Sequence, residues 1–134
     1  MKKILLIEDN SDNAFLFRSL LSLRDIQLIE ANTGLDGVKL ALEENPDLIL
    51  MDIQLPDITG LEATRRIRKA LGDSICIVAV TSYAMSGDRN RCLSAGCNGY
   101  IEKPINPETF LQDVDSFMGR TPENYIPESN SNEN

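Results

Sequence analysis

Polar side chains follow four of the apolar segments of this chain, at the point where each segment ends. They are Glu8 with Asp9, Asp52, Thr81 with Ser82, and Lys103. A buried strand rarely carries a charge unless that charge is paired or takes part in chemistry. If the segments are parallel strands, their carboxyl ends meet at one edge of a sheet, and these groups share one site.

The chemistry open to such a site is set by its three carboxylates, Glu8, Asp9 and Asp52. Carboxylates this close raise one another's pKa unless a cation joins them, and Mg²⁺ is the natural cation for oxygen ligands. A backbone carbonyl just after Asp52, such as that of Gln54, can complete the ligand set. Metal and Lys103 would neutralise phosphoryl oxygens while the Asp52 carboxylate attacks in line. The set therefore favours phosphoryl transfer to Asp52.

The composition excludes several other classes of function. The chain has no histidine, which rules out Ser-His-Asp and Cys-His sites and a histidine phosphocarrier. A net charge of −8 makes it a poor candidate for binding nucleic acid or an anionic membrane. The apolar runs are too short to span a bilayer, and Glu8 and Asp9 interrupt any signal peptide. We expect a cytoplasmic protein whose three cysteines are small buried hydrophobes.

Strand-like and helix-like segments alternate five times along the chain. Strands are predicted at 3–8, 26–31, 48–52, 75–80 and 99–102. Helices are predicted from Asn10 or Ser11, from Thr33, at 60–71, at 86–95 and from Pro107 to Met118. This alternation predicts an α/β fold, a doubly wound (βα)5 domain with a five-stranded parallel sheet of order 2-1-3-4-5. The domain spans 1–118, and the polar segment 119–134 is expected to be a disordered tail.

Each polar residue also has a purely structural interpretation. An aspartate at a strand end is often a cap or loop residue, and Glu8, Asp9 and Asn10 could simply cap the first helix. Threonine favours strands, and Lys103 with Pro104 is a common exit from one. The coincidence at four strand ends favours a functional site.

Four stretches, "LLIEDN", "PDLILMDIQLPDITGLE", "VAVTSYAMSGD" and "GCNGYIEKPI", resemble receiver domains of two-component response regulators in order and spacing. The resemblance covers about residues 2–118 and implies the flavodoxin-like receiver fold. It implies a phosphoryl-accepting module of a two-component or phosphorelay system, not a turnover enzyme. The implied partners are a histidine kinase or histidine phosphotransfer protein and a downstream protein effector, with no DNA-binding output segment after residue 118.

The resemblance also implies a role for individual residues. Asp52 would accept the phosphoryl group from a phosphohistidine, and Lys103 would pair first with Asp52 and then with that group. Asp9 would bind Mg²⁺ directly, Glu8 through water, and the Gln54 carbonyl would be a third protein ligand besides Asp52.

A switch is implied as well. Thr81 would move onto a phosphoryl oxygen, letting Tyr100 turn inward and reshaping the surface formed by the fourth helix, fifth strand and fifth helix. An aromatic residue on a short strand is equally typical of simple packing, so both interpretations of Tyr100 stay open. Glu8 departs from the family's more frequent aspartate, and Gln54 and Tyr83 hold positions that tune the lifetime of the phosphoryl group.

Two other functions are compatible with the chain. An aspartyl-phosphate hydrolase would need a second acid two residues after Asp52, where Gln54 stands. A receiver-like scaffold that works without phosphate would have no need of Asp9, Asp52, Thr81 and Lys103 together. Both alternatives are therefore weaker than the phosphoryl-accepting receiver.

Overall fold

The computed structural model describes residues 1–82 and 88–119. The strands are β1 (Lys2–Ile7), β2 (Ile26–Ala31), β3 (Leu48–Asp52), β4 (Cys76–Thr81) and β5 (Gly99–Glu102). The helices are α1 (Ser11–Leu21), α2 (Gly34–Glu44), α3 (Gly60–Leu71), α4 (Asp88–Ala95) and α5 (Pro107–Met118). None of the helices within these residues is long and apolar enough to cross a membrane.

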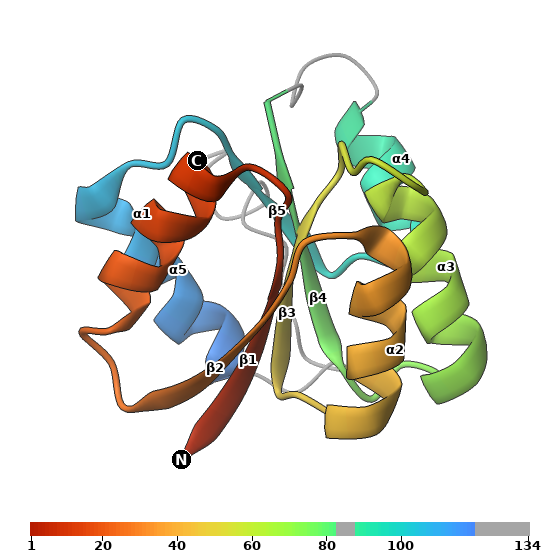
Figure 1. Ribbon diagram of the computed structural model, residues 1–134, viewed down its shortest axis with the longest axis horizontal. Helices are drawn as coiled ribbons and strands as arrows, with labels where there is room; N and C mark the ends of the chain where they lie inside the picture. Colours follow the sequence, from red (N-terminus) through yellow and green to blue (C-terminus); the bar gives the residue numbers. More distant parts are fainter. Residues whose placement is uncertain (83–87, 120–134) are drawn as a thin grey trace, which may run out of the picture.

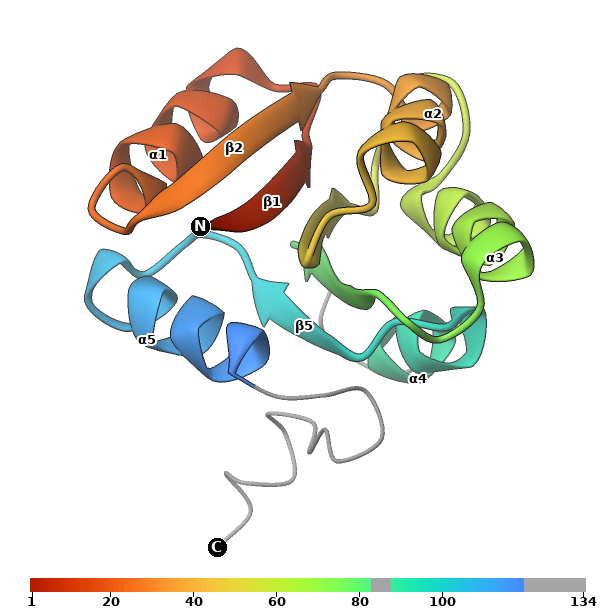
Figure 2. The same ribbon diagram turned by 90° about the horizontal axis from the view of Figure 1, so that it is seen from below.

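The five strands form one parallel sheet in the order β2-β1-β3-β4-β5, so the predicted order is confirmed. Helices α1 and α5 cover one face, and α2, α3 and α4 cover the other (Figures 1 and 2). An apolar cluster fills the space under each helical layer. The three cysteines are buried in these clusters, as expected. The sheet is thus fixed from both sides, and its carboxyl edge remains for polar side chains.

The register of the sheet brings the ends of β1, β3 and β4 level with one another. Ile7 pairs with Met51, and Asp52 pairs with Val80. The strand predicted at 3–8 runs from Lys2 to Ile7 in the structure, so each bound is wrong by one residue. Pairing with β2 already begins at Lys2, and pairing with β2 and β3 stops at Ile7. Glu8 therefore lies just beyond the strand, where its side chain is released to the edge.

The remaining boundaries agree with the sequence with small differences. The fourth strand runs one residue later than predicted, because Thr81 pairs with Glu102 of β5. The first helix is capped by Asn10, whose Oδ1 accepts the N–H of Asn13 at 2.9 Å. The predicted helix start at 86–87 and the tail after Gly119 lie outside the described residues.

Arg68 joins the end of α3 to the connection between α4 and β5. Its half-buried guanidinium donates to the carbonyls of Gly96 at 2.9 Å and Ile75 at 2.6 Å, and to Asn98 Oδ1 at 2.7 Å. Asn98 Oδ1 also accepts the N–H of Ile77 at 2.8 Å. A guanidinium carries five N–H donors in a fixed plane, so one side chain ties three backbone segments together.

The last turn of α4 ends in a left-handed glycine cap. Gly96 has φ +115° and donates to the Leu93 carbonyl at 3.1 Å, while the N–H of Cys97 reaches the Cys92 carbonyl at 3.0 Å. This pair of hydrogen bonds is the Schellman motif, which satisfies the carbonyls that a helix end leaves free. With Arg68 on the Gly96 carbonyl, this end of α4 is held firmly.

Candidate functional site

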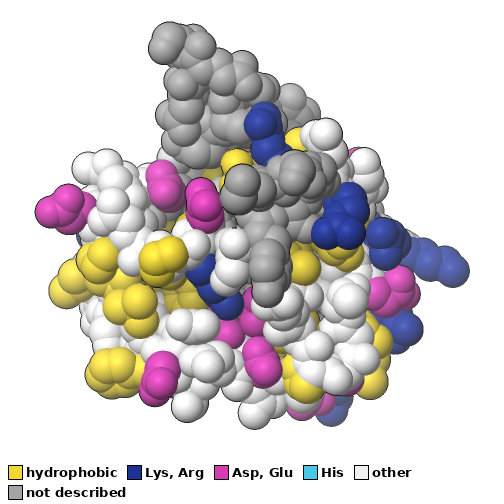
Figure 3. All heavy atoms as spheres, turned by 90° about the horizontal axis from the view of Figure 1, so that it is seen from above, with side chains coloured by type: hydrophobic (Ala, Val, Ile, Leu, Met, Phe, Trp, Pro, Cys, Tyr) yellow, Lys and Arg dark blue, Asp and Glu magenta, His cyan; other side chains and the backbone are white. Residues whose placement is uncertain are grey.

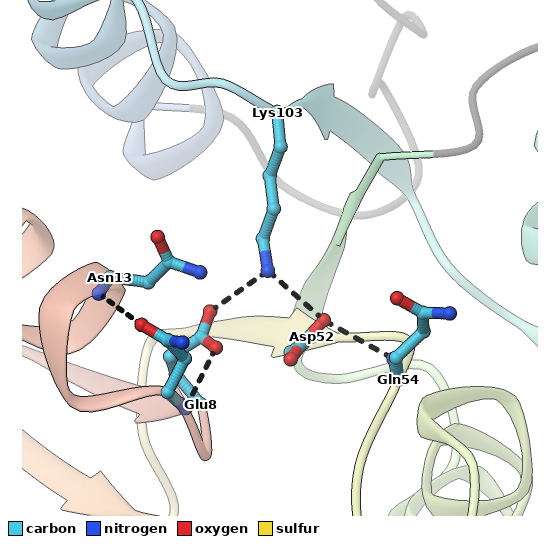
Figure 4. A network of polar contacts seen from close by, with 6 residues as sticks. Glu8, Asn13, Asp52, Gln54 and Lys103 are labelled. Carbon is cyan, nitrogen blue, oxygen red and sulfur yellow. Dashed lines mark hydrogen bonds and ion pairs between the residues drawn. The ribbon is translucent and has the colours of Figure 1, made fainter.

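Asp52 lies buried at the carboxyl edge of the sheet, at the end of β3. Its Oδ1 accepts the N–H of Gln54 at 3.2 Å and lies 3.3 Å from Lys103 Nζ (Figure 4). Asp52 ends a strand with neighbours on both sides, so the backbone that carries it cannot shift without disturbing the core. The structure therefore presents one fixed carboxylate in contact with one cation.

Glu8 and Lys103 approach Asp52 from either side. Glu8 follows β1, and its Oε2 accepts the N–H of Asn10 at 3.2 Å. Lys103 follows β5, and its N–H continues the strand pairing by donating to the Thr81 carbonyl at 2.8 Å. Lys103 Nζ lies 3.2 Å from Glu8 Oε1. The ammonium is thus placed between two buried carboxylates that belong to different strands (Figure 4).

The residues present fit a divalent cation. Glu8, Asp9 and Asp52 each offer one carboxylate oxygen, and these atoms lie within 4.8 Å of one another. Among the described residues, the buried Glu8 Oε1 has no hydrogen-bond donor, since Lys103 reaches it only as an ion pair. Asp9 is exposed, so the cluster opens to solvent on its side, and Figure 3 shows acidic and basic side chains meeting on this face. An all-oxygen, partly open set is the kind that Mg²⁺ takes.

The electrostatics of the metal-free site act mainly on Asp52. Burial, followed by the neighbouring Glu8 carboxylate, raises the pKa of Asp52 to about 7. Lys103 and the Gln54 N–H act in the opposite direction, but they do not cancel this rise. Near neutral pH, Asp52 in the metal-free protein is therefore poised between its protonated and ionised forms.

We expect Mg²⁺ to bind more tightly as the pH rises from 6 to 8. Below pH 7 the ion must displace the proton of Asp52, so its apparent affinity should rise about tenfold per pH unit and level off above the pKa. Isothermal titration calorimetry in buffers of different ionisation enthalpy measures both the affinity and the released proton.

Asp52→Asn is the control for this titration, and it should remove the pH dependence. The chain has no histidine, so no other side chain ordinarily titrates in this window. The stability of the metal-free protein should change with pH in the opposite direction to its Mg²⁺ affinity. A carboxyl whose pKa is raised by folding favours the folded state at low pH. Its contribution is lost as the pH rises through about 7, so the metal-free protein should be less stable at pH 8 than at pH 6. A Mg²⁺ affinity independent of pH would contradict the assignment.

Thr81 and Tyr100 lie where the sequence placed them, on adjacent strands. Thr81 is buried at the end of β4, on the same edge as Asp52. Tyr100 pairs with Ala79 in the ladder and is half-buried, and it packs against the apolar cluster under α2, α3 and α4. This packing agrees with the structural interpretation of Tyr100, and its role as a switch stays a prediction. Tyr83 lies outside the described residues.

Two features of the site are not predicted by the sequence. The pattern predicts Lys103 beside Asp52 but not beside Glu8, because the reach of a side chain cannot be read from spacing. It predicts a turn and a helix start at Gly60, but no close approach of this glycine to the backbone of Asp52. In the structure Thr59 caps that helix, and a Cβ on Gly60 would lie 2.2 Å from the carbonyl oxygen of Asp52. The available signal was a glycine at a helix start that already had a threonine cap.

Comparison with known proteins gives one consistent family. The sequence model of the response regulator receiver domain family matches residues 4–115 of this chain. The polar-differentiation response regulator DivK of Brucella ovis is 41% identical over 119 residues, which cover 88% of this chain and 97% of the Brucella protein. DivK of Brucella anthropi is 41% identical over 121 residues, with the same coverage.

Solved structures agree with this family at the level of three-dimensional shape. The receiver domain of a sensor histidine kinase from Pseudomonas aeruginosa, with a magnesium ion coordinated in its active-site cleft, is 34% identical. It superposes with a TM-score of 0.81 and covers 89% of this chain and 98% of its own. The receiver domain of Saccharomyces cerevisiae Ssk1, crystallised with the histidine phosphotransfer protein Ypd1, is 29% identical with a TM-score of 0.81, covering 88% and 89%. With the matching sheet order and edge site, these similarities show that the chain belongs to the response regulator receiver domain family.

Proposed function

We propose that Asp52 accepts a phosphoryl group from a phosphohistidine on a partner protein. The observation that carries this proposal is the convergence of Asp52, Lys103 and the carboxylates of Glu8 and Asp9 at one edge of the sheet. Membership of the receiver family supports it. The protein then acts as the receiver of a two-component or phosphorelay system.

In the proposed reaction the Asp52 carboxylate attacks the phosphorus in line, and the histidine leaves from the opposite side. Asp9, Asp52, the Gln54 carbonyl and, through water, Glu8 would hold Mg²⁺. The metal ion supplies positive charge to the phosphoryl oxygens. Lys103, which follows β5, adds a second positive charge. The hydrogen bond from its backbone N–H to the Thr81 carbonyl keeps this residue at the edge of the sheet.

We propose further that Thr81 and Tyr100 report the phosphoryl group to a binding surface. The Thr81 hydroxyl would donate to a phosphoryl oxygen, and Tyr100 would turn inward into the space that Thr81 leaves. Thr81 ends β4 beside β5, and Tyr100 belongs to β5, so their movement would alter the surface formed by α4, β5 and α5. Packing of Tyr100 without any switching remains the alternative. The NMR signals of the Tyr100 ring separate the two, because only a switch moves the ring to a new environment when beryllofluoride and Mg²⁺ are added.

The proposed partners follow from the chemistry of the donor. A histidine kinase or a histidine phosphotransfer protein would supply the phosphoryl group, as the Ssk1–Ypd1 pairing supports. A separate protein effector would bind the phosphorylated form, in the cytoplasm. The residues of this chain would catalyse only the gain and loss of their own phosphoryl group, within a receiver at 1–118 followed by a polar tail at 119–134.

The test uses acetyl phosphate or beryllofluoride with Mg²⁺ on the full chain. Amide signals around Thr81 and Tyr100 should shift, and mass spectrometry should find one phosphoryl group on Asp52. Asp52→Asn should abolish both results, whereas Asp25→Asn, an exposed control, should leave them unchanged. The absence of any Mg²⁺-dependent change, or a response that persists in Asp52→Asn, would refute the proposal. Failure to bind Mg²⁺ at millimolar concentration would favour the phosphate-independent scaffold.

A further inference from the structure

One ammonium group serves two buried carboxylates in the metal-free protein. Lys103 Nζ lies 3.2 Å from Glu8 Oε1 and 3.3 Å from Asp52 Oδ1. The side chains of Glu8 and Asp52 are 1% and 5% exposed, so water screens neither carboxylate well. Lys103 is therefore shared almost equally between the phosphoacceptor and its acidic neighbour.

The length of the Glu8 side chain makes this sharing possible. Its Oε2 is fixed by the N–H of Asn10, and its Oε1 extends to Lys103. An aspartate at this position would end one methylene earlier, withdrawing the carboxylate by about 1.5 Å. Glu8 Oε1 has no hydrogen-bond donor among the described residues, so its charge is compensated chiefly by Lys103. Glu8 thus has a strong electrostatic reason to hold the ammonium.

We propose that Glu8 is a positioning residue that retains Lys103 in the metal-free site and releases it to the phosphoryl acceptor when Mg²⁺ binds. The proposal rests on the proposed function, since it concerns the same site. Without metal, the two buried carboxylates of Glu8 and Asp52 share one ammonium. A divalent cation that draws on Glu8 takes over the compensation of its charge, and the hold of Glu8 on Lys103 weakens.

This arrangement couples two binding events. Lys103 is then free for a phosphoryl group only after the metal has arrived, so each ligand should raise the affinity of the other. Glu8→Asp should weaken this coupling, because its shorter side chain leaves Lys103 to Asp52 even in the absence of metal. Glu8→Gln should do the same by removing the charge while keeping the length.

The experiment observes the ¹⁵Nζ and ¹³Cε signals of Lys103 by NMR, assigned with Lys103→Arg. In the wild-type protein these signals should shift when Mg²⁺ is added. In metal-free Glu8→Asp and Glu8→Gln they should already differ from the metal-free wild type. Asp25→Asn is the control: it removes an exposed carboxylate outside the site, so the metal-free Lys103 signals should remain those of the wild type.

A second readout measures the coupling itself. Mg²⁺ should raise the affinity of the wild-type protein for beryllofluoride by about tenfold or more, and the factor should be smaller in Glu8→Asp. Unchanged metal-free Lys103 signals in both Glu8 variants would overturn the proposal and leave Glu8 a metal ligand only. That result would leave the proposal that Asp52 is phosphorylated unaffected. Conversely, a failure of phosphorylation would not change the expected Lys103 signals of the metal-free protein. The two proposals therefore fail separately.

Discussion

Gly60→Ala is expected to destabilise the protein by about 3 kcal/mol and to impair its phosphorylation. The added Cβ would lie 2.2 Å from the carbonyl oxygen of Asp52 and 2.8 Å from the Cα of Ile53. Both are backbone atoms that cannot rotate away. Gly60 also donates its N–H to the Ile53 carbonyl at 2.8 Å, so the whole turn after Asp52 must open to admit a methyl group. A shift of this turn displaces the phosphoacceptor.

Urea denaturation followed by circular dichroism measures the first effect, and the rate of phosphorylation by acetyl phosphate measures the second. Gly119→Ala is the matched control, because its Cβ would meet its nearest atom, the Asp115 carbonyl oxygen, at 3.4 Å. That distance is ordinary contact, and the variant should unfold at nearly the wild-type midpoint. Equal midpoints for Gly60→Ala and the wild type would show that the turn is not held against the glycine.

Lys103→Gln should slow phosphoryl acceptance about 10²- to 10³-fold at saturating Mg²⁺. Losing one preorganised donor from a charge-stabilising site typically has an effect of this size. The cause is specific here, since Lys103 lies 3.3 Å from Asp52 Oδ1 and no second lysine or arginine among the described residues forms an ion pair with Asp52. Rapid quench with a phosphohistidine donor measures the rate.

Lys103→Arg tests whether charge alone is sufficient. A guanidinium keeps the charge but is larger and planar, so it should not fit between Glu8 and Asp52 as the ammonium does. We expect Lys103→Arg to recover part of the rate, clearly less than the wild type. If Lys103→Gln accepted phosphoryl groups at the wild-type rate, the lysine would be only a structural ion pair.

The sequence was sufficient to predict the fold because its signals were local and strong. Continuous apolar runs marked the buried strands, glycines and threonines marked the helix ends, and alternation of the elements fixed the parallel sheet. The error at Glu8 has a physical cause. Composition does not distinguish the last paired residue of a strand from the first residue released beyond it, and only the register places that boundary after Ile7.

The grouping of the site residues followed from the topology, but their contacts did not. Strand ends placed Glu8, Asp9, Asp52 and Lys103 on one edge, and the structure brings them together. The contact of Lys103 with both Glu8 and Asp52 depends on the lengths and directions of the three side chains, which the sequence does not give. The roles implied for Asp52, Gln54, Thr81 and Tyr100 remain predictions that the experiments above address.

Arg68, on helix α3, is a second residue whose contacts could not be predicted from the sequence. It belongs to a basic run of this helix, and its neighbours Arg65, Arg66 and Lys69 are exposed. Arg68 instead turns back to three carbonyl oxygens and one side-chain amide oxygen. Two of these acceptors, at Gly96 and Asn98, lie 28 and 30 residues further along the chain, so the periodicity of α3 could not predict them.

The contacts of Arg68 and the glycine cap hold the C-terminal end of α4 in place beside Gly96. The helix has 8 residues, so about 12 Å separate this anchored end from Asp88. Thr81 lies seven positions before Asp88, so a movement of the chain at the site would reach α4 at the end opposite this anchor. A displacement there is largest at Asp88 and vanishes near Gly96. The structure therefore predicts that α4 responds by tilting about its C-terminal end and not by sliding along its axis.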